Sequence, residues 1–273
     1  MHRRRSACLL PLAILFLLVA ASDPSTAVEV SGILDADPTW DPADSPFHVT
    51  GNLRIPETVT LTIAPGVTVI VSADVNPARG IYLLVEGTLH ARGTLESPII
   101  FTAEDRDSPW GGIVFQDSTQ DWNEETAVGS ILENCLIAFT GNTTLYGSAG
   151  IRIYSAQPMI RNNTIRYGGD AGIWATDFLT ARSPSGNLQI LSNRIHGHAV
   201  GIRLNLEGGE IRNNYLTGNA QGLSIRTSAN DLMIGENTVV HDALQWIDAG
   251  LNLTLDRDEA DNGIASYHWV QTA

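Results

Sequence analysis

Short stretches in which apolar and polar residues alternate fill the chain after residue 21. Ile151 and Ile153 flank the polar Arg152, and the same alternation recurs at 202–204 and 223–225. A period of two residues is typical of β-strands that are buried on one face, whereas an amphipathic helix repeats every 3.6 residues. Since no segment after residue 21 sustains the helical period, the pattern predicts an all-β protein.

Two short motifs recur along the chain, and in the middle copies they alternate at a nearly constant spacing. The motif Ile-x-x-Asn-x-aliphatic places its asparagines at Asn134, Asn163, Asn193, Asn214 and Asn237. The motif Gly-aliphatic-x-apolar begins at Gly80, Gly112, Gly150, Gly172, Gly201, Gly222 and Gly250. Each repeat unit that these motifs define holds short strands that cannot bury their apolar faces alone, so the units must stack. Parallel stacking gives a β-solenoid with rungs ~4.8 Å apart. In it the asparagines are predicted to be turn residues that pair between rungs.

The segment before these motifs continues the same design. Alternation in 59–63 and 67–71 is interrupted by the tight turn at 64–66. We predict four parts: a signal peptide at 1–21, an Asp/Pro-rich entry segment and N-terminal cap at 22–48, a parallel β-helix at 49–254, and a C-terminal cap or tail at 255–273.

The first residues indicate export from the cytoplasm. Three arginines at 3–5 precede an apolar run at 9–21, which ends in small residues. This arrangement is typical of a secretory signal peptide, and the run is too short to span a bilayer. The sequence therefore predicts a secreted or periplasmic protein with no membrane span in the mature chain.

Charge narrows the choice of partners. The chain has 16 Lys+Arg against 30 Asp+Glu, for a formal net charge of −14, and every one of the 16 cations is arginine. An acidic chain disfavours nucleic acid as a partner. The lack of lysine excludes Schiff-base chemistry and a lysine general base.

Three stretches carry a resemblance to a known family: 61–71 (LTIAPGVTVIV), 83–104 (LLVEGTLHARGTLESPIIFTAE) and 110–115 (WGGIVF). They resemble the N-terminal part of bacterial secreted right-handed parallel β-helix proteins, and the Asn and Gly motifs are similar to the parallel β-helix repeats of the same pectate-lyase-like superfamily. The resemblance covers roughly residues 30 to 255 and implies a single-stranded right-handed parallel β-helix. The superfamily includes pectate lyases, polygalacturonases, alginate epimerases, phage tailspikes and adhesins, so the fold alone does not choose an activity.

The Gly motif also predicts which side chains face outward. If the first and third residues after the glycine point into the core, the second and fourth face solvent in two columns, the first of which runs from Tyr82 to Asn252. The middle of the columns holds six candidate substrate-binding residues: Arg152, Tyr154, Trp174, Arg203, Asn205 and Arg226. Arginine forks pair with carboxylates, and aromatic rings stack on sugars, so an acidic polysaccharide lying along the stack would suit them. The more conservative interpretation is that these side chains cover the sheet through cation–π and cross-strand contacts.

Patterns that would carry catalysis or bind a metal are missing from these columns. Neither column contains Asp or Glu, which calcium-dependent pectate lyases use to hold their metal. No Asp-Asp or Gly-His-Gly element of polygalacturonase-like enzymes is present. We therefore predict no metal site and no cofactor. One acidic run near the C-terminus has oxygen ligands to offer Ca²⁺, although a solvated cap is the interpretation that we favour: Asp256, Asp258 and Asp261.

We therefore expect a secreted β-helix repeat protein that binds glycan without catalysis or acts as a surface or periplasmic scaffold. A polysaccharide lyase or glycoside hydrolase acting on acidic polysaccharide is the alternative, and a scaffold that contacts protein is the second alternative. The lack of a carboxylate pair in the outward columns favours binding. The sequence leaves the oligomeric state open.

Overall fold

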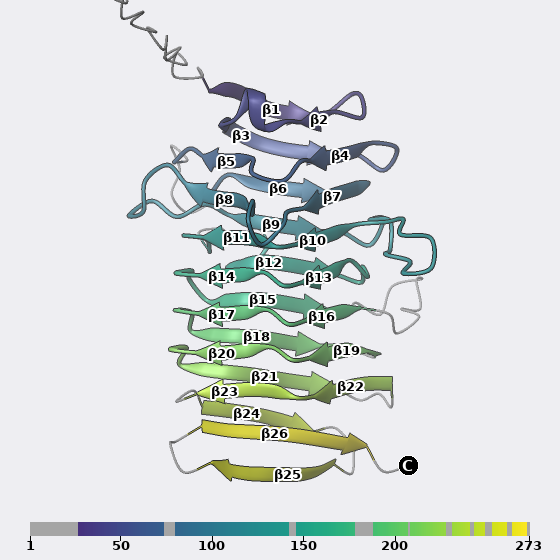
Figure 1. The fold of residues 1–273 in the computed structure, drawn as a ribbon, viewed down its shortest axis with the longest axis vertical. Coiled ribbons are helices and arrows are strands. Elements are labelled where there is room, and N and C mark those ends of the chain that lie inside the picture. The colour runs from purple at the N-terminus through teal and green to yellow at the C-terminus, as the bar shows by residue number, and fades with distance from the viewer. Residues whose placement is uncertain are drawn as a thin grey trace, which may run out of the picture.

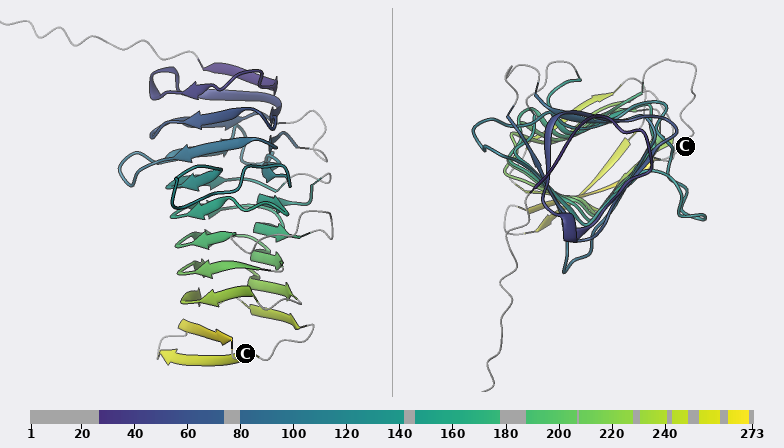
Figure 2. Two further views of the ribbon diagram at one scale, coloured as in Figure 1. Left: turned by 90° about the vertical axis from the view of Figure 1, so that its right-hand side faces the viewer. Right: turned by 90° about the horizontal axis from the view of Figure 1, so that it is seen from above.

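The computed structural model is a tall solenoid built of short β-strands (Figure 1). It describes residues 27–73, 80–141, 146–177, 188–206, 208–227, 231–240, 243–248, 253–260 and 264–271, and for the last three ranges strand pairing alone is described. Viewed along the stack, the chain winds around a three-sided tube (Figure 2). The described part contains a single helical turn, the 3-10 turn η1 (Pro42–Asp44). The all-β class and the predicted parallel β-helix are confirmed.

Three series of stacked strands repeat along the tube, and within each series neighbouring strands are parallel. The first series consists of β6 (Tyr82–Val85), β9 (Gly112–Phe115), β12 (Ala149–Tyr154), β15 (Ala171–Thr176), β18 (Val200–Asn205), β21 (Gln221–Thr227) and β24 (Ala243–Asp248). The second series consists of β2 (Thr39–Trp40), β4 (Thr60–Ile63), β7 (Thr88–Arg92), β10 (Ile131–Glu133), β13 (Met159–Arg161), β16 (Gln189–Leu191), β19 (Gly208–Arg212) and β22 (Asp231–Gly235). The third series consists of β5 (Thr68–Val71), β8 (Ile99–Ala103), β11 (Cys135–Ala138), β14 (Thr164–Arg166), β17 (Arg194–His196), β20 (Tyr215–Thr217) and β23 (Asn237–Val240).

The parallel stack begins before residue 49, where the sequence placed its start. Strand β1 (Val28–Ile33) already pairs in parallel with β3 (Phe47–Ile55). Trp40 is buried and stacks on Phe47, with the ring centroids 4.5 Å apart. Because β1 is mostly exposed, it lacks the alternation by which a half-buried strand is found in a sequence. The predicted signal peptide at 1–21 lies outside the described residues.

The other end of the stack is closed by an antiparallel hairpin. Strand β26 (Ile264–Gln271) pairs antiparallel with β23 and with β25 (Leu253–Ala260). Parallel pairing therefore ends with β24, shortly before the predicted boundary at residue 254.

Inward-facing aliphatic side chains stack on their counterparts in the next rung and form one continuous core. Ile165, Ile195 and Leu216 are partners in consecutive strands of the third series, and each is 0% exposed. Burying one such side chain contributes roughly 1.5–3 kcal/mol. The last aliphatic residue of the Asn motif thus faces the core in these strands, and each rung stabilises its neighbours by the same contact.

A ladder of buried asparagines runs down one turn of the solenoid. It consists of Asn163, Asn193, Asn214 and Asn237, each 1% exposed. In the first three, Nδ2 donates to Oδ1 of the next asparagine at 2.9–3.0 Å and to a backbone carbonyl of the preceding rung at 2.8–2.9 Å. The backbone N–H of each donates to that same Oδ1. Each amide is satisfied by its neighbours, so the predicted pairing between rungs is confirmed.

The first asparagine motif is offset by one residue from its predicted alignment. Leu132, and not Ile131, pairs with Ile160, so Asn134 is not a member of the ladder. The offset could not be predicted from the sequence, because Ile131 and Leu132 are both apolar and both buried. Ile131 faces outward and packs against Trp122. A residue that is apolar on both faces gives no signal of register.

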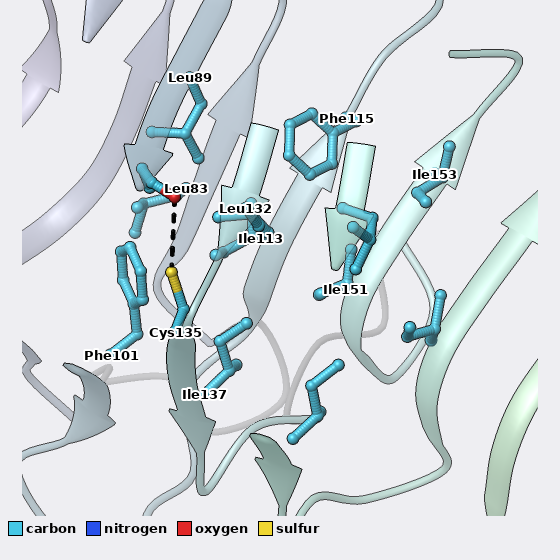
Figure 3. Close-up of a cluster of buried hydrophobic side chains, with 14 of the residues drawn as sticks. Leu83, Leu89, Phe101, Ile113, Phe115, Leu132, Cys135, Ile137, Ile151 and Ile153 are labelled. Atoms are coloured by element: carbon cyan, nitrogen blue, oxygen red, sulfur yellow. Dashed lines mark hydrogen bonds between the residues drawn. The ribbon is translucent and has the colours of Figure 1, made fainter. Parts of the chain in front are cut away.

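Cys135 occupies the first position of the ladder. Its backbone N–H donates to Oδ1 of Asn163 at 2.9 Å, and its Sγ lies 3.6 Å from the carbonyl oxygen of Ala91 among the apolar side chains of the core (Figure 3). Burial raises the pKa of the thiol to about 12, so Cys135 is structural and not a nucleophile. The residue before each ladder position adopts a left-handed backbone conformation, with φ between 50° and 57°: Asn134, Asn162, Ser192, Asn213 and Glu236.

Replacing one ladder residue tests how much the ladder stabilises the fold. Asn214→Leu leaves the carbonyl of Ile190 without its donor and the N–H of Asn193 without its acceptor. Each buried unpaired group costs about 1–3 kcal/mol, so we expect the free energy of unfolding in urea to fall by at least ~3 kcal/mol. Asn213→Gly is the control, since Asn213 is exposed with φ of 57°, and it should change stability by less than ~1 kcal/mol. Equal losses in the two variants would contradict the ladder's role.

A buried histidine lies in the turn that leads into β18. His198 is 5% exposed, and its backbone N–H donates to Oδ1 of Asn219, the residue in the same position one rung later. Burial lowers the pKa of His198 to about 4, and the nearby His196 acts in the same direction. The imidazole is therefore neutral in the folded protein at neutral pH.

This histidine should make the protein less stable in acid. Because the pKa of an unfolded histidine is about 6.5, the unfolded chain binds a proton at this site between pH 6.5 and about 4, whereas the folded chain does not. Stability is thus lost as pH falls through this window, by about 3 kcal/mol in total. His198→Asn, which repeats the residue type of Asn219, should flatten the decline in urea unfolding free energies measured at pH 7, 5.5 and 4.5. The same slope in both proteins would show that His198 does not titrate in this way.

Candidate ligand-binding site

The six predicted binding residues lie on the outer face of the first series. The register aligns Arg152 with Trp174, and Trp174 with Arg203. The neighbouring column holds Tyr154, Thr176, Asn205 and Arg226 in consecutive strands. In the middle of the face, the columns are therefore those that the Gly motif predicts.

The columns differ from the prediction at their two ends. Leu84, and not Tyr82, aligns with Val114, because the first Gly motif is out of register with the others. Leu84 and Val114 are both buried although they face outward, so alternation gave no signal here. At the other end Gln245 takes the place predicted for Asn252, which lies outside the described residues.

Tyr146, which precedes β12, covers the N-terminal part of this face. It packs edge-on against Tyr82, with the ring centroids 5.0 Å apart. The backbone oxygen of Tyr146 accepts hydrogen bonds from Nε of Arg152 at 3.0 Å and from the hydroxyl of Tyr154 at 2.6 Å. Burial raises the pKa of Tyr146 to about 12. The part of the face that is open to a ligand therefore begins near Trp174.

Arg152 is a buried cation held by aromatic rings and neutral oxygens. It is 4% exposed, and its guanidinium lies 4.0 Å from the ring centroid of Tyr154 and 4.1 Å from that of Trp174. Its Nη1 donates to the carbonyl of Trp174 at 2.7 Å, and both Nη atoms lie within 3.3 Å of Oγ1 of Thr176. Burial lowers its pKa. Arg152 thus supports Trp174, with its donors turned toward protein oxygens.

Arg203 contacts Trp174 from the next rung, with its guanidinium 4.7 Å from the ring centroid. Both Nη atoms of Arg203 donate to the carboxylate of Asp170, in a bidentate ion pair. The sequence analysis missed Asp170, because it precedes β15 and falls in neither outward column. Since guanidinium groups lie over the Trp174 ring from both neighbouring rungs, a sugar stacked on this ring would have to displace one of them.

The face is hollowed between Trp174 and Arg226 into a half-open pocket of about 400 Å³. Five of the six predicted residues line it, together with Thr176, Leu204 and Ser224. The lining does not include Tyr154, whose ring contacts the Arg152 guanidinium. Asn205 and Arg226 are exposed. No ion pair joins Arg226 to any side chain that the structure describes. The described lining therefore offers an aromatic edge, an amide and one exposed cation without an ion pair, and it contains no carboxylate.

No metal centre is present among the described residues, which include no group of three or more His, Cys, Asp or Glu side chains placed to hold an ion. Asp256 and Asp258, expected in an acidic loop, lie in strand β25, and Asp261 lies outside the described residues. The described part also has no helix long and apolar enough to cross a membrane.

The stacked parallel strands are those of a right-handed parallel β-helix protein. Family models agree: residues 104–239 match the right handed beta helix region, and residues 32–155 match the pectate-lyase like beta helix domain. The chain therefore belongs to the right-handed parallel β-helix proteins, which settles its fold and leaves its activity to be argued from the site. No curated protein and no solved structure gives a significant match.

Two arginines of this face should differ sharply in what they contribute to stability. Arg152→Met removes the donor to the Trp174 carbonyl and two cation–π contacts, so we expect the free energy of unfolding to fall by about 2–3 kcal/mol. Arg226→Gln changes an exposed side chain and should alter it by less than ~0.5 kcal/mol. Urea unfolding of the two variants beside the wild type makes the comparison. A neutral Arg152→Met variant would mean that the stacked cation does not hold the face together.

Proposed function

We propose that the protein binds an acidic polysaccharide in the half-open pocket of the first series without catalysing a reaction. The observation that carries the proposal is the exposed Arg226, which has no carboxylate partner among the described side chains of a chain with a net charge of −14. Five described arginines pair with a carboxylate, namely Arg54, Arg92, Arg161, Arg203 and Arg212. Of the described arginines without an ion pair, Arg152 and Arg226 line the pocket, and Arg152 is buried. A cation left open in a pocket is therefore available to an anionic ligand.

The pocket fits a uronate unit better than a neutral sugar. The Arg226 fork takes the carboxylate, the amide of Asn205 bonds to hydroxyl groups, and the edge of Trp174 supplies an apolar wall. Because the faces of the Trp174 ring are held by Arg152 and Arg203, recognition rests on charge and hydrogen bonds more than on stacking.

The lining favours binding over catalysis. Hydrolysis of a glycosidic bond uses two carboxyl groups that flank it, and the described lining contains none. The match to the pectate-lyase like model keeps a polysaccharide lyase as the second candidate, and a scaffold that contacts only protein is the third. We also propose that the protein acts in the periplasm or outside the cell, because residues 1–21 have the pattern of a signal peptide.

Retention on immobilised polymers tests the proposal. The mature protein should be retained on polygalacturonate or alginate and much less on a neutral glucan, and added salt should weaken retention. Arg226→Gln should weaken binding to the uronate polymers about tenfold. Arg212→Gln is the matched control, because Arg212 is also partly exposed but already pairs with Glu210.

Two outcomes would overturn the proposal. Unchanged retention of Arg226→Gln on every acidic polymer would remove the pocket from consideration. Release of new reducing ends or unsaturated products from polygalacturonate or alginate would replace binding by catalysis.

A further inference from the structure

Two arginines and a histidine lie together on the outer face of the third series, away from the strands that form the pocket. This basic strip consists of Arg166 on β14 and Arg194 and His196 on β17. Arg166 pairs with His196 across neighbouring strands, and Arg194 pairs with Tyr215 of the next strand. The Gly motif did not point to these residues, because they follow the Asn motif on another side of the tube.

The cations of the strip have no carboxylate partner among the described residues. No ion pair includes Arg166 or Arg194, although both are on the surface. The Nε of Arg166 is buried without a hydrogen-bond partner. Burial, and then these same two arginines, lower the pKa of His196, so its imidazole is neutral at neutral pH and offers one N–H donor. The strip therefore places two unneutralised arginines and a neutral donor side by side on a chain with 30 acidic residues.

Aromatic rings hold the guanidinium groups in place. Arg166 lies over Tyr167 at 5.3 Å from the ring centroid, and Arg194 lies over Tyr215 at 5.0 Å. Tyr167 in turn packs edge-on against His196 and stacks on Phe139. Because these rings are engaged with each other and with arginine, they are poor platforms for nucleobases, which bind single strands by stacking.

The strip is also free of long insertions. The connections that enter β14, β17 and β20 are two residues each, at 162–163, 192–193 and 213–214. Those that leave β14 and β17 span 167–170 and 197–199. Arg166 and Arg194 lie in adjacent rungs, ~4.8 Å apart along the axis, a spacing that suits an extended chain carrying repeated anions.

We propose that Arg166, Arg194 and His196 form a second anion-binding site, which takes the carboxylate or sulfate groups of an acidic polysaccharide laid along the third series. Arginine forks on the strip donate to the oxyanions, as in other charge-assisted hydrogen bonds. The site stands on its own geometry and does not require the pocket. With the pocket occupied as well, one molecule would hold two polymer strands on two faces, a consequence that rests on the proposed function.

Calorimetric titration of the mature protein with a short oligogalacturonate, and in parallel with a sulfated oligosaccharide, tests the second site. The wild type should bind two equivalents of the better ligand. Arg166→Gln/Arg194→Gln should lose one of them, with at least tenfold weaker binding at the strip, and Arg226→Gln should lose the other. Arg92→Gln/Arg212→Gln is the charge-matched control, since both residues are about 40% exposed on the second series and already paired; it should keep both equivalents.

The outcomes separate the two sites. If the Arg166→Gln/Arg194→Gln variant keeps the stoichiometry and affinities of the wild type, the second site is overturned. If Arg226→Gln changes nothing while the strip variant loses its equivalent, the pocket fails and the strip stands. Binding of single-stranded DNA to the strip as tight as that of the oligosaccharide would also overturn the glycan assignment. Arg194→Gln alone, at an exposed position, serves if the double variant does not fold, and it should still weaken one equivalent.

Discussion

Parallel rungs stack at a fixed spacing, so each side chain that one rung buries must find a matching contact or hydrogen-bond partner in the next rung. The asparagine ladder satisfies this condition for polar groups, because Asn193 both donates to Asn214 and accepts from Asn163. The first position needs no acceptor of its own, since it has only to supply a backbone N–H to Asn163. Cys135 can therefore begin the ladder, and its partner one rung earlier is the apolar Ile99. The ladder therefore starts at Cys135, between the apolar Ile99 of the preceding rung and Asn163 of the next.

The same spacing governs the outer face. Two cations in adjacent rungs would lie ~4.8 Å apart and repel each other by about 0.9 kcal/mol even in water. Placing Trp174 between Arg152 and Arg203 moves them two rungs apart, and each guanidinium gains a ring. On the third series Arg194 likewise has Tyr215 next to it in its own column, and Arg166 of the adjacent rung lies in the other column. An alternation of cation and aromatic ring is thus a structural solution for a solenoid surface, and evidence for a ligand lies only in the cations that stay unpaired after it.

The fold could be predicted from the sequence because each rung repeats one pattern of inward aliphatic residues. Prediction failed where two adjacent residues are both apolar. Ile131 with Leu132, and Leu83 with Leu84, are buried on both faces, and register cannot be inferred from such pairs. The residues of the candidate site were predicted from the sequence, but the groups that pair with its arginines or cover them were not. Asp170 neutralises Arg203 from outside the strand, and the cover over Arg152 comes from Tyr146 in a connection whose path no periodicity encodes.

The connections between strands determine which arginines are paired or covered and which stay accessible to a ligand. On the second series Arg161 meets Glu133 of the neighbouring strand and Glu124 of the connection between β9 and β10. Trp122 of that same connection is buried against this side. On the first series Tyr146 covers the face as far as Arg152. The third series has short connections at β14, β17 and β20, and there Arg166 and Arg194 have no carboxylate partner among the described residues. Repeats of one kind thus build three different surfaces, and the difference arises from the connections between strands. Since the repeats fix the fold and the connections fix the surface, a family match that reports the repeats cannot report the function.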